Sequence, residues 1–497
     1  MTIYQKILQN QKASSLLIII FFLLLAFFYL YQLNKLPLTA YDEAIYAQVT
    51  RQTLVSSQIT TLYNFGQAWL EKPPLYFWLA MTSVKIFGDS EAAFRLPSAL
   101  LAILSFCLVY LVTKKLSGKK SLGLMAAFIL AIIPFYYITG RQVRLDVPLT
   151  AIILSTIYVF ILGWDNKKYL LGIFPLMALA VLTKNIVGLL AIPFVLIFSL
   201  IYKQWSWLKS KYFWLGLPIG LLLAIPWHWR QYQLWGNNFL ETYLGFHVLN
   251  RFSSGFGNVT QTNPLSYFHI LWDYSWPWWQ IFILLLIVAL ILKKFYHTEK
   301  SWRLLLTSWT IMAFVIFFFS LSKTKISSYL LLMYPYLAIA IAVSLSYLWQ
   351  IIKHKWLKIL YLLFTGALCL YSILLCLGQD DRILKNFHFF YDYNLRDIGR
   401  LINLENKPNA KIYYLSGPPA ETINFYAQQP VSQVSVDQET KTINLSGPAF
   451  IYLYDSNLPL FLDDAGQVKK EFSSIRVKYS QDHILLLYGE QDIVLHF

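Results

Sequence analysis

The segment SLLIIIFFLLLAFFYLYQL, residues 15–33, contains no charged residue and is long enough to cross a bilayer as an α-helix. A helix satisfies its backbone hydrogen bonds internally, as the hydrocarbon interior of a membrane requires. The run is too long for the apolar part of a secretory signal peptide, and no A-x-A-like cleavage site follows it. It is therefore predicted to be a retained first membrane span.

Apolar runs of similar length recur as far as residue 377. The predicted spans are 15–33, 92–113, 122–138, 146–163, 168–183, 186–202, 212–227, 277–292, 302–321, 329–349 and 356–377. The 497 residues are 57% hydrophobic, 18% aromatic and only 13% charged, and that charge is about half of what an average soluble domain carries. These runs predict a polytopic α-helical membrane protein with about 11–13 spans. The three cysteines all lie in apolar runs, so they imply neither a disulfide nor a zinc site.

The net charge of +16 would suggest a nucleic-acid ligand in a soluble chain. Here the positive charge gathers in short basic loops, such as KKLSGKK at 114–120, so the positive-inside rule explains it and no nucleic-acid partner is predicted. The alternate loops carry acids, prolines and aromatic residues: 34–91, 139–145, 184–185, 228–276, 322–328 and the tail from 378. We expect a plasma (inner) membrane protein with a cytoplasmic N-terminus and these segments on the periplasmic or extracytoplasmic side.

Two domains are predicted, a transmembrane domain over 1–377 and a small extracytoplasmic α/β domain over 378–497. In the long outer loop 34–91, helical spacing predicts a helix beginning at Asp42, and residues 74–88 suit a helix on the membrane surface. In the C-terminal domain, strands are predicted at 411–417 and 448–455, a hairpin at 474–490 and a short helix at 419–428. The domain shows no catalytic motif, so a lid or a recognition module is its expected role.

Acidic residues stand at the predicted membrane edge. LTAYDEAIYAQ, residues 38–48, places Asp42 and Glu43 directly after the first span, and Asp146 opens a later one. Acids near a membrane are costly unless they are solvated or paired, which makes them functional candidates. The alternative for Asp42 is helix capping, in which its carboxylate accepts backbone N–H bonds.

Basic residues share this side of the predicted topology, where positive charge is otherwise disfavoured. They are Lys72, Arg141, Arg144, Lys184, Arg251, Lys323 and Lys325. Arginine at an interface can simply reach for lipid headgroups, and the neighbours Glu71 and Lys72 can form an incidental ion pair. The functional interpretation is an anion clamp, because guanidinium binds phosphate through parallel hydrogen bonds. His247 could be a general base, a metal ligand or a plain interfacial histidine.

Cations beside carboxylates at a lipid surface suit a lipid-linked phosphate. The cations would neutralise a phosphate leaving group, and a carboxylate would take the proton from an acceptor hydroxyl. A sugar donor used outside the cell must be tethered to such a lipid, because nucleotide sugars are not supplied there. The sequence therefore favours a sugar linked to a lipid phosphate as donor, with membrane lipids around it.

Several motifs resemble one family. DEAIYAQVTRQTL, WLEKPPLYFWLAMTSVKIFGDSEAAFRLPSAL, RLDVPLT, LTKNIVGLL, FHVLNRF and SLSKTKISSYLLLMYP resemble bacterial GT-C glycosyltransferases of the dolichyl-phosphate-mannose-protein mannosyltransferase type, above all the ArnT-like aminoarabinose lipid A transferases. The resemblance covers roughly residues 15–350 in order and spacing. It implies a GT-C fold, a cell-envelope enzyme and an inverting sugar transfer from a polyprenyl-phosphate sugar donor to an acceptor on the outer face.

The resemblance also implies residue roles. Asp42 matches the proposed catalytic aspartate, with Glu43 beside it and Asp146 as a second, supporting acid. The donor-phosphate group comprises Lys72, Arg141, Arg144, Lys184, Arg251, Lys323 and Lys325, together with Tyr329, which matches the family tyrosine after the basic motif. Glu71 and His247 resemble a metal-contacting pair, so a divalent metal is the one candidate cofactor.

Two other classes of function compete with a glycosyltransferase. A transporter or flippase for lipid-linked glycans would place charges at mid-membrane depth, whereas the predicted spans are almost free of them. A non-catalytic scaffold would tolerate loss of the loop cations. The sequence leaves the sugar, the acceptor (lipid, glycan or protein) and the oligomeric state open.

Overall fold

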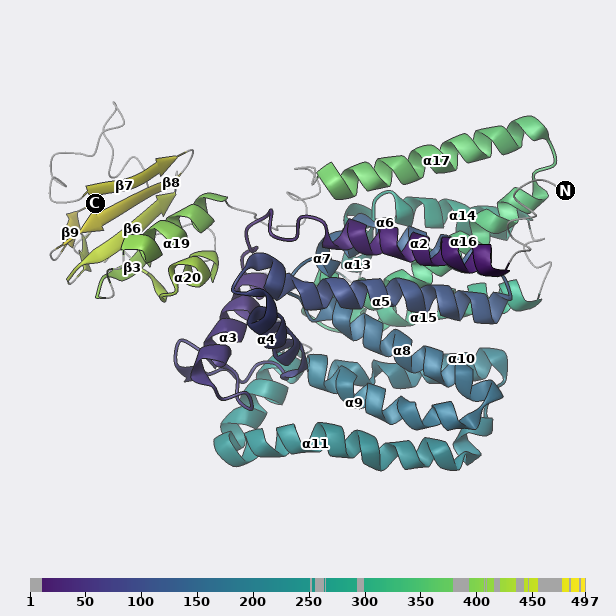
Figure 1. Ribbon diagram of the computed structural model, residues 1–497, viewed down its shortest axis with the longest axis horizontal. Helices are drawn as coiled ribbons and strands as arrows, with labels where there is room; N and C mark the ends of the chain where they lie inside the picture. Colours follow the sequence, from purple (N-terminus) through teal and green to yellow (C-terminus); the bar gives the residue numbers. More distant parts are fainter. Residues whose placement is uncertain are drawn as a thin grey trace. The chain divides into compact units, whose positions relative to one another are not determined.

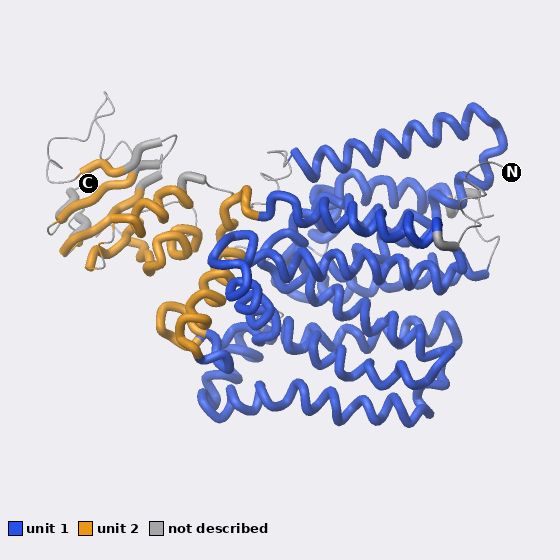
Figure 2. Tube along the Cα trace, in the orientation of Figure 1, with its two compact units in different colours: residues 1–33, 58–62, 69–388 blue, residues 34–57, 63–68, 389–497 orange. Residues whose placement is uncertain are grey.

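The computed structural model describes residues 11–250, 253–254, 263, 265–292, 299–378, 393–405, 407, 409–414, 421–434, 442–445, 447–454, 476–481, 484–490 and 493–496. The chain forms two compact units, coloured separately in Figure 2. Unit 1 comprises residues 1–33, 58–62 and 69–388, and unit 2 comprises residues 34–57, 63–68 and 389–497. Unit 2 therefore combines part of the first long loop with the C-terminal region.

Unit 1 is a bundle of helices (Figure 1). Its long apolar helices include α2 (Gln11–Leu30), α5 (Glu91–Ser117), α8 (Asp146–Asp165), α15 (Glu299–Ser320), α16 (Tyr334–Ile351) and α17 (Lys355–Gly378). Helix α5 lies at the centre, because it packs against α2, α4 (Leu75–Phe87), α6 (Lys120–Ile132) and α8. Helix α16, the most buried of the long apolar segments, packs against α6, α14 (Trp278–Leu292) and α15.

The described residues contain seven helical segments long and apolar enough to span a membrane, or up to nine if each of two bent pairs is one span. The first pair joins α6 to α7 (Pro134–Gly140) with a bend of 72°, and the second joins α13 (Ser266–Tyr274) to α14 with a bend of 111°. Proline at the start of α7 lacks the N–H that would continue α6. The polytopic helical prediction is confirmed, and each of its spans overlaps a helix.

One segment that counts as a single span holds two helices. Residues Lys167–Tyr202 divide into η1 (Lys167–Gly172), α9 (Ile173–Lys184), η2 (Asn185–Leu190) and α10 (Ala191–Tyr202). The chain reverses after α9, where Asn185 has φ 50°. A Cβ atom on Gly188 would lie 2.4 Å from the backbone carbon of Ala180, so only glycine allows this close return. The short polar interruption therefore closes a tight helical hairpin, as the predicted spans 168–183 and 186–202 require.

Helix α11 (Lys211–Leu240) extends beyond the predicted span 212–227. It is not one of the seven described segments that are long and apolar enough to span a membrane. It packs against η1 and α9 and bends at Gly236, where φ is 51°. The π-helix η4 (Glu241–Asn250) follows it, and η3 (Ser206–Lys209) precedes it. Residues 228–240, predicted as the start of an outer loop, thus continue a helix. The apolar segment 74–88 forms α4 as predicted, and its place on the membrane surface stays a prediction.

Unit 2 contains a five-stranded mixed sheet of order β4-β3-β6-β8-β7. Its strands are β3 (Lys411–Tyr414), β4 (Val431–Gln433), β6 (Ala449–Tyr454), β7 (Arg476–Gln481) and β8 (Ile484–Gly489). Strand β3 runs parallel to β4 and β6, whereas β8 runs antiparallel to β6 and β7. Strands β5 (Thr442–Leu445) and β9 (Ile493–His496) form a separate antiparallel pair, as do β1 (Tyr63–Asn64) and β2 (Gln67–Ala68). The predicted C-terminal strands and hairpin are confirmed.

Helices α3 (Asp42–Ser56), α19 (Tyr393–Glu405) and α20 (Glu421–Ala427) complete unit 2. Helices α19 and α20 close one hydrophobic core with the sheet, built on Ile398, Ile412, Ile423, Phe450 and Leu486. Helix α3 was predicted from its apolar spacing, and the short α20 from the proline near the start of its segment. Helix α3 packs against α20, so the described domain takes in residues 34–57 beside the C-terminal part.

Candidate functional site

The two adjacent acids at the start of α3 have different surroundings. Glu43 is fully buried, and its Oε2 accepts hydrogen bonds from the backbone N of Thr39 at 2.8 Å and from the Thr39 hydroxyl at 2.9 Å. Asp42 is half-buried and is the first residue of the helix, where the helix dipole stabilises a carboxylate. The geometry thus gives Glu43 the task of fixing the entry to α3, while the catalytic role of Asp42 stays a prediction.

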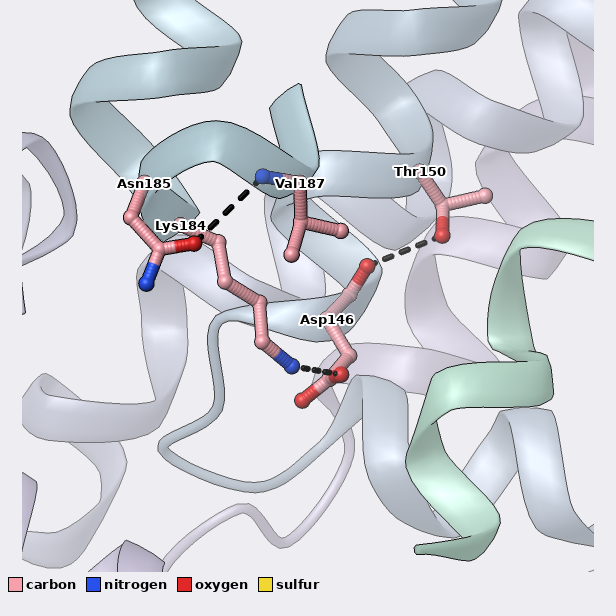
Figure 3. A network of polar contacts seen from close by, with 5 residues as sticks. All are labelled: Asp146, Thr150, Lys184, Asn185 and Val187. Atoms are coloured by element: carbon pink, nitrogen blue, oxygen red, sulfur yellow. Dashed lines mark hydrogen bonds and ion pairs between the residues drawn. The ribbon is translucent and has the colours of Figure 1, made fainter. Parts of the chain in front are cut away.

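In unit 1, Asp146 and Lys184 form an ion pair (Figure 3). Asp146 opens α8 and Lys184 closes α9, and their side chains are only 8% and 13% exposed. Each charge has the sign that its helix end favours. The Lys184 ammonium also lies 5.0 Å from the centre of the Tyr329 ring, just before α16. Three predicted site residues from separate helix ends therefore meet in one cluster, Asp146–Lys184–Tyr329, in which Asp146 is buried and the other two residues are half-buried.

The short loop after α15 bears two lysines, of which Lys325 is buried and Lys323 is exposed. Lys325 is buried, and its ammonium donates to the backbone oxygens of Ser320 at 2.9 Å and Ser322 at 2.8 Å. Burial lowers the pKa of Lys325. The ammonium therefore caps the carbonyl end of α15. Lys323 is exposed and forms no ion pair with any described residue, so its charge is available to an anion.

The two arginines between α7 and α8 are both engaged with the protein. Arg141 donates to the backbone oxygens of Phe28 at 3.1 Å, Tyr31 at 2.7 Å and Gln32 at 3.3 Å, and it also bonds the hydroxyl of Tyr137. It therefore caps the end of α2. Arg144 is buried, and its Nε donates to the side chain of Gln142 at 2.9 Å.

The predicted metal-contacting pair is only half described. The Glu71 carboxylate lies 4.0 Å from the ammonium of Lys72, which is buried. The His247 side chain and all of Arg251 lie outside the described residues. No group of three His, Cys, Asp or Glu side chains in the described part of the chain could hold a metal ion. Because the His247 side chain lies outside the described part of the chain, the divalent metal stays a prediction.

An apolar cavity of about 490 Å³ lies between α9–η2 and α11–η4. Its lining includes Val181, Ile186, His228, Trp229 and Tyr243. The His228 ring is bonded on both sides, to the backbone oxygen of Ala224 at 2.8 Å and to the Tyr243 hydroxyl at 3.1 Å. Sequence reasoning missed this cavity because it ended the helix at 227. The run HWRQYQLW contains neither glycine nor proline, which was the available signal that the helix continues.

Comparisons with known proteins agree with this architecture. The family model described as dolichyl-phosphate-mannose-protein mannosyltransferase matches residues 71–229. An uncharacterised protein of Aquifex aeolicus is 30% identical over 63% of this chain and 69% of its own length. An undecaprenyl phosphate-alpha-4-amino-4-deoxy-L-arabinose arabinosyl transferase of Aeromonas hydrophila is 28% identical over 64% of this chain, which spans 58% of that enzyme.

Among solved structures, ArnT from Cupriavidus metallidurans bound to undecaprenyl phosphate matches with a TM-score of 0.71. The match covers 96% of this chain and 98% of that one at 17% identity. This likeness shows a shared fold along almost the whole length of both chains.

Proposed function

This chain belongs to the dolichyl-phosphate-mannose-protein mannosyltransferase family, among its ArnT-like membrane glycosyltransferases of the GT-C fold, and from that membership we propose its reaction. The chain transfers a sugar from a polyprenyl-phosphate donor to an acceptor hydroxyl on the outer face of the membrane. Undecaprenyl phosphate stands in the names of the arabinosyl transferase relatives, which supports a donor of that class.

The observation that carries the proposal is the Asp146–Lys184–Tyr329 cluster. It places the largely buried ammonium at the end of α9 beside Asp146, at the start of α8, and beside the ring of Tyr329. Tyr329 follows the short loop that bears the exposed Lys323. Cations fixed at helix ends can stabilise a phosphate that gains charge as the sugar leaves. The apolar cavity along α9 and α11 offers a place for a prenyl chain beside such a phosphate.

The chemistry needs one base and one leaving group. The acceptor oxygen attacks the anomeric carbon, and its proton passes to the Asp42 carboxylate. The bond from the anomeric carbon to the phosphate oxygen breaks, and polyprenyl phosphate leaves with that electron pair. Attack from the face opposite the phosphate inverts the anomeric centre. Lys184 and Lys323 are assigned to the phosphate, while Asp146 holds the Lys184 side chain in place.

The test is sugar transfer in proteoliposomes, with undecaprenyl-phosphate aminoarabinose and undecaprenyl-phosphate mannose labelled in the sugar. We expect Asp42→Asn to lower the rate at least about 100-fold, the usual scale for a general base. Asp165→Asn, at an exposed acid paired with Lys115, is the matched control and keeps the wild-type rate. Wild-type transfer by Asp42→Asn would overturn the base assignment. Movement of intact donor across the bilayer without its consumption would instead indicate a transporter.

The proposed orientation places the N-terminus in the cytoplasm and unit 2 outside the inner membrane. Gln67 of unit 2 and Lys119 between α5 and α6 are both exposed and lie on opposite sides in this topology. In right-side-out vesicles, a membrane-impermeant maleimide should label Gln67→Cys and spare Lys119→Cys. The reverse labelling pattern would overturn the orientation.

A further inference from the structure

Helix α20 of the C-terminal region makes several direct contacts with α3, the helix that begins with Asp42. The Arg51 guanidinium donates to the backbone oxygen of Phe425 at 2.6 Å and lies 3.7 Å from the centre of its ring. The backbone N of Leu38 donates to the hydroxyl of Tyr426 at 3.0 Å. These contacts fix α3 near both of its ends, so the C-terminal region determines where the helix lies within unit 2.

A third contact reaches the residue next to Asp42. Glu421, the first residue of α20, accepts a hydrogen bond from the backbone N–H of Tyr41. Tyr41 precedes Asp42 and has a φ of 61°, a conformation that non-glycine residues adopt only when their surroundings hold them. Glu421 thus holds the strained backbone of Tyr41, the residue that directly precedes Asp42.

The Glu421 carboxylate also lacks a described cation that would balance its negative charge. Among the described residues, its buried Oε2 atom has no hydrogen-bond partner, and no lysine or arginine forms an ion pair with the carboxylate. Burial, and then the negative charge of Asp42, raise the pKa of Glu421, while the backbone N–H groups of Glu421 and Tyr41 oppose this. The Tyr41 phenol, whose pKa is raised by burial, Glu421 and Tyr414, adds no positive charge, and Arg51 is engaged with Phe425.

We propose that α20 is a positioning element for the predicted base, and that Glu421 is the positioning residue that sets both the orientation and the charge of Asp42. The inference rests on the proposed function, in which Asp42 takes the acceptor proton. A carboxylate at Glu421 disfavours a second negative charge at Asp42, whereas a protonated Glu421 permits it. The C-terminal region then takes part in the chemistry, beyond a role as a lid or a recognition module.

Two substitutions separate the charge from the hydrogen bond. Glu421→Gln keeps an acceptor for the Tyr41 N–H and removes the charge, so the acidic limb of the kcat profile should move to lower pH by roughly half to one unit. Glu421→Ala removes both, and we expect kcat to fall by up to about 100-fold through misplacement of Asp42, with the donor KM little changed. A purely structural contact would not move the pH profile of the glutamine variant.

The controls keep this inference separate from the proposed function. Glu490→Gln changes an exposed acid of the same unit, which sits 3.9 Å from Arg476, and should leave the profile unchanged. Hydrogen exchange of the peptide 38–46 reports directly on the start of α3, and it should rise in Glu421→Ala only. Inactive Asp42→Asn together with a wild-type pH profile for Glu421→Gln would overturn the inference alone. Active Asp42→Asn would overturn the base assignment on which it rests.

Discussion

The carboxylate of Asp146, the first residue of α8, pairs with the ammonium of Lys184, the last residue of α9, and both side chains are largely buried. Removing one partner leaves the other charge desolvated and alone. We therefore expect Lys184→Met to lower the free energy of unfolding by about 3–5 kcal/mol. The measurement is thermal unfolding of the purified protein in detergent.

The double variant Asp146→Leu/Lys184→Met should recover most of that stability, because two apolar side chains replace the buried pair. It should not recover transfer activity, because the phosphate has lost a cation. The exposed pair of Lys115 and Asp165 is the matched control, and Lys115→Met should cost less than about 1 kcal/mol. Recovery of activity in the double variant would show that Lys184 serves stability alone.

The second prediction concerns the hydrogen bonds that the buried Glu43 carboxylate accepts from Thr39 at the start of α3. Thr39→Val removes the hydroxyl bond to Glu43 and keeps the backbone bond, so it should cost about 1 kcal/mol. Glu43→Ala removes both bonds, and it should also lower kcat because Asp42 is the neighbouring residue. Thr82→Val, at an exposed hydroxyl bonded within its own helix, is the matched control. Equal kcat for Glu43→Ala and the wild type would show that the entry to α3 does not position Asp42.

Local patterns predicted the elements better than their partners. The helix that begins at Asp42, the apolar helix 74–88 and the C-terminal strands follow from spacing and composition, because each depends on residues close in sequence. The hairpin of α9 and α10 was predicted because charge and polarity interrupt two apolar runs. Pairings between distant segments, such as Asp146 with Lys184 or Glu421 with Tyr41, leave no local signal.

The same limit applies to the predicted phosphate cations. Their residue types are evident in the sequence, and their side of the membrane stays a prediction. Arg141 and Lys325, however, cap helix ends, where carbonyl groups compete for the same donors. Only the folded structure distinguishes a cation that caps a helix end from an exposed one such as Lys323. The wider extent of α11 was missed because a span of average length already accounted for its apolar part.

Arg141 carries the third prediction, since its guanidinium bonds three backbone oxygens at the end of α2. Lysine keeps the charge but cannot reproduce the fork, so Arg141→Lys should lower the unfolding free energy by about 1.5–3 kcal/mol. Arg303→Lys, in an exposed pair with Glu299, should cost at most about 0.5 kcal/mol. An increase in donor KM without any change in unfolding temperature would instead place Arg141 on the donor.

Lys325 gives a pH-dependent prediction. Burial lowers its pKa below 10.5, so between the lowered pKa and 10.5 the unfolded chain binds a proton that the folded chain releases. Stability from this group therefore rises with pH in that window, by at most about 1.4 kcal/mol per pH unit. From neutral to alkaline pH, the unfolding temperature of the wild type should rise relative to that of Lys325→Met. Parallel curves would contradict a buried ammonium.

The exposed Lys323 should behave differently from Lys325, two residues away. Lys323→Ala removes a charge without a described partner, so the unfolding temperature should stay within about 1 °C, because such surface changes are worth less than about 0.5 kcal/mol. If its ammonium attracts the donor phosphate, the donor KM should rise several-fold and depend less on salt. Lys353→Ala, at an exposed lysine on the predicted cytoplasmic side, is the matched control. An unchanged KM with an unchanged salt dependence would remove Lys323 from the donor site and leave Lys184 as its main cation.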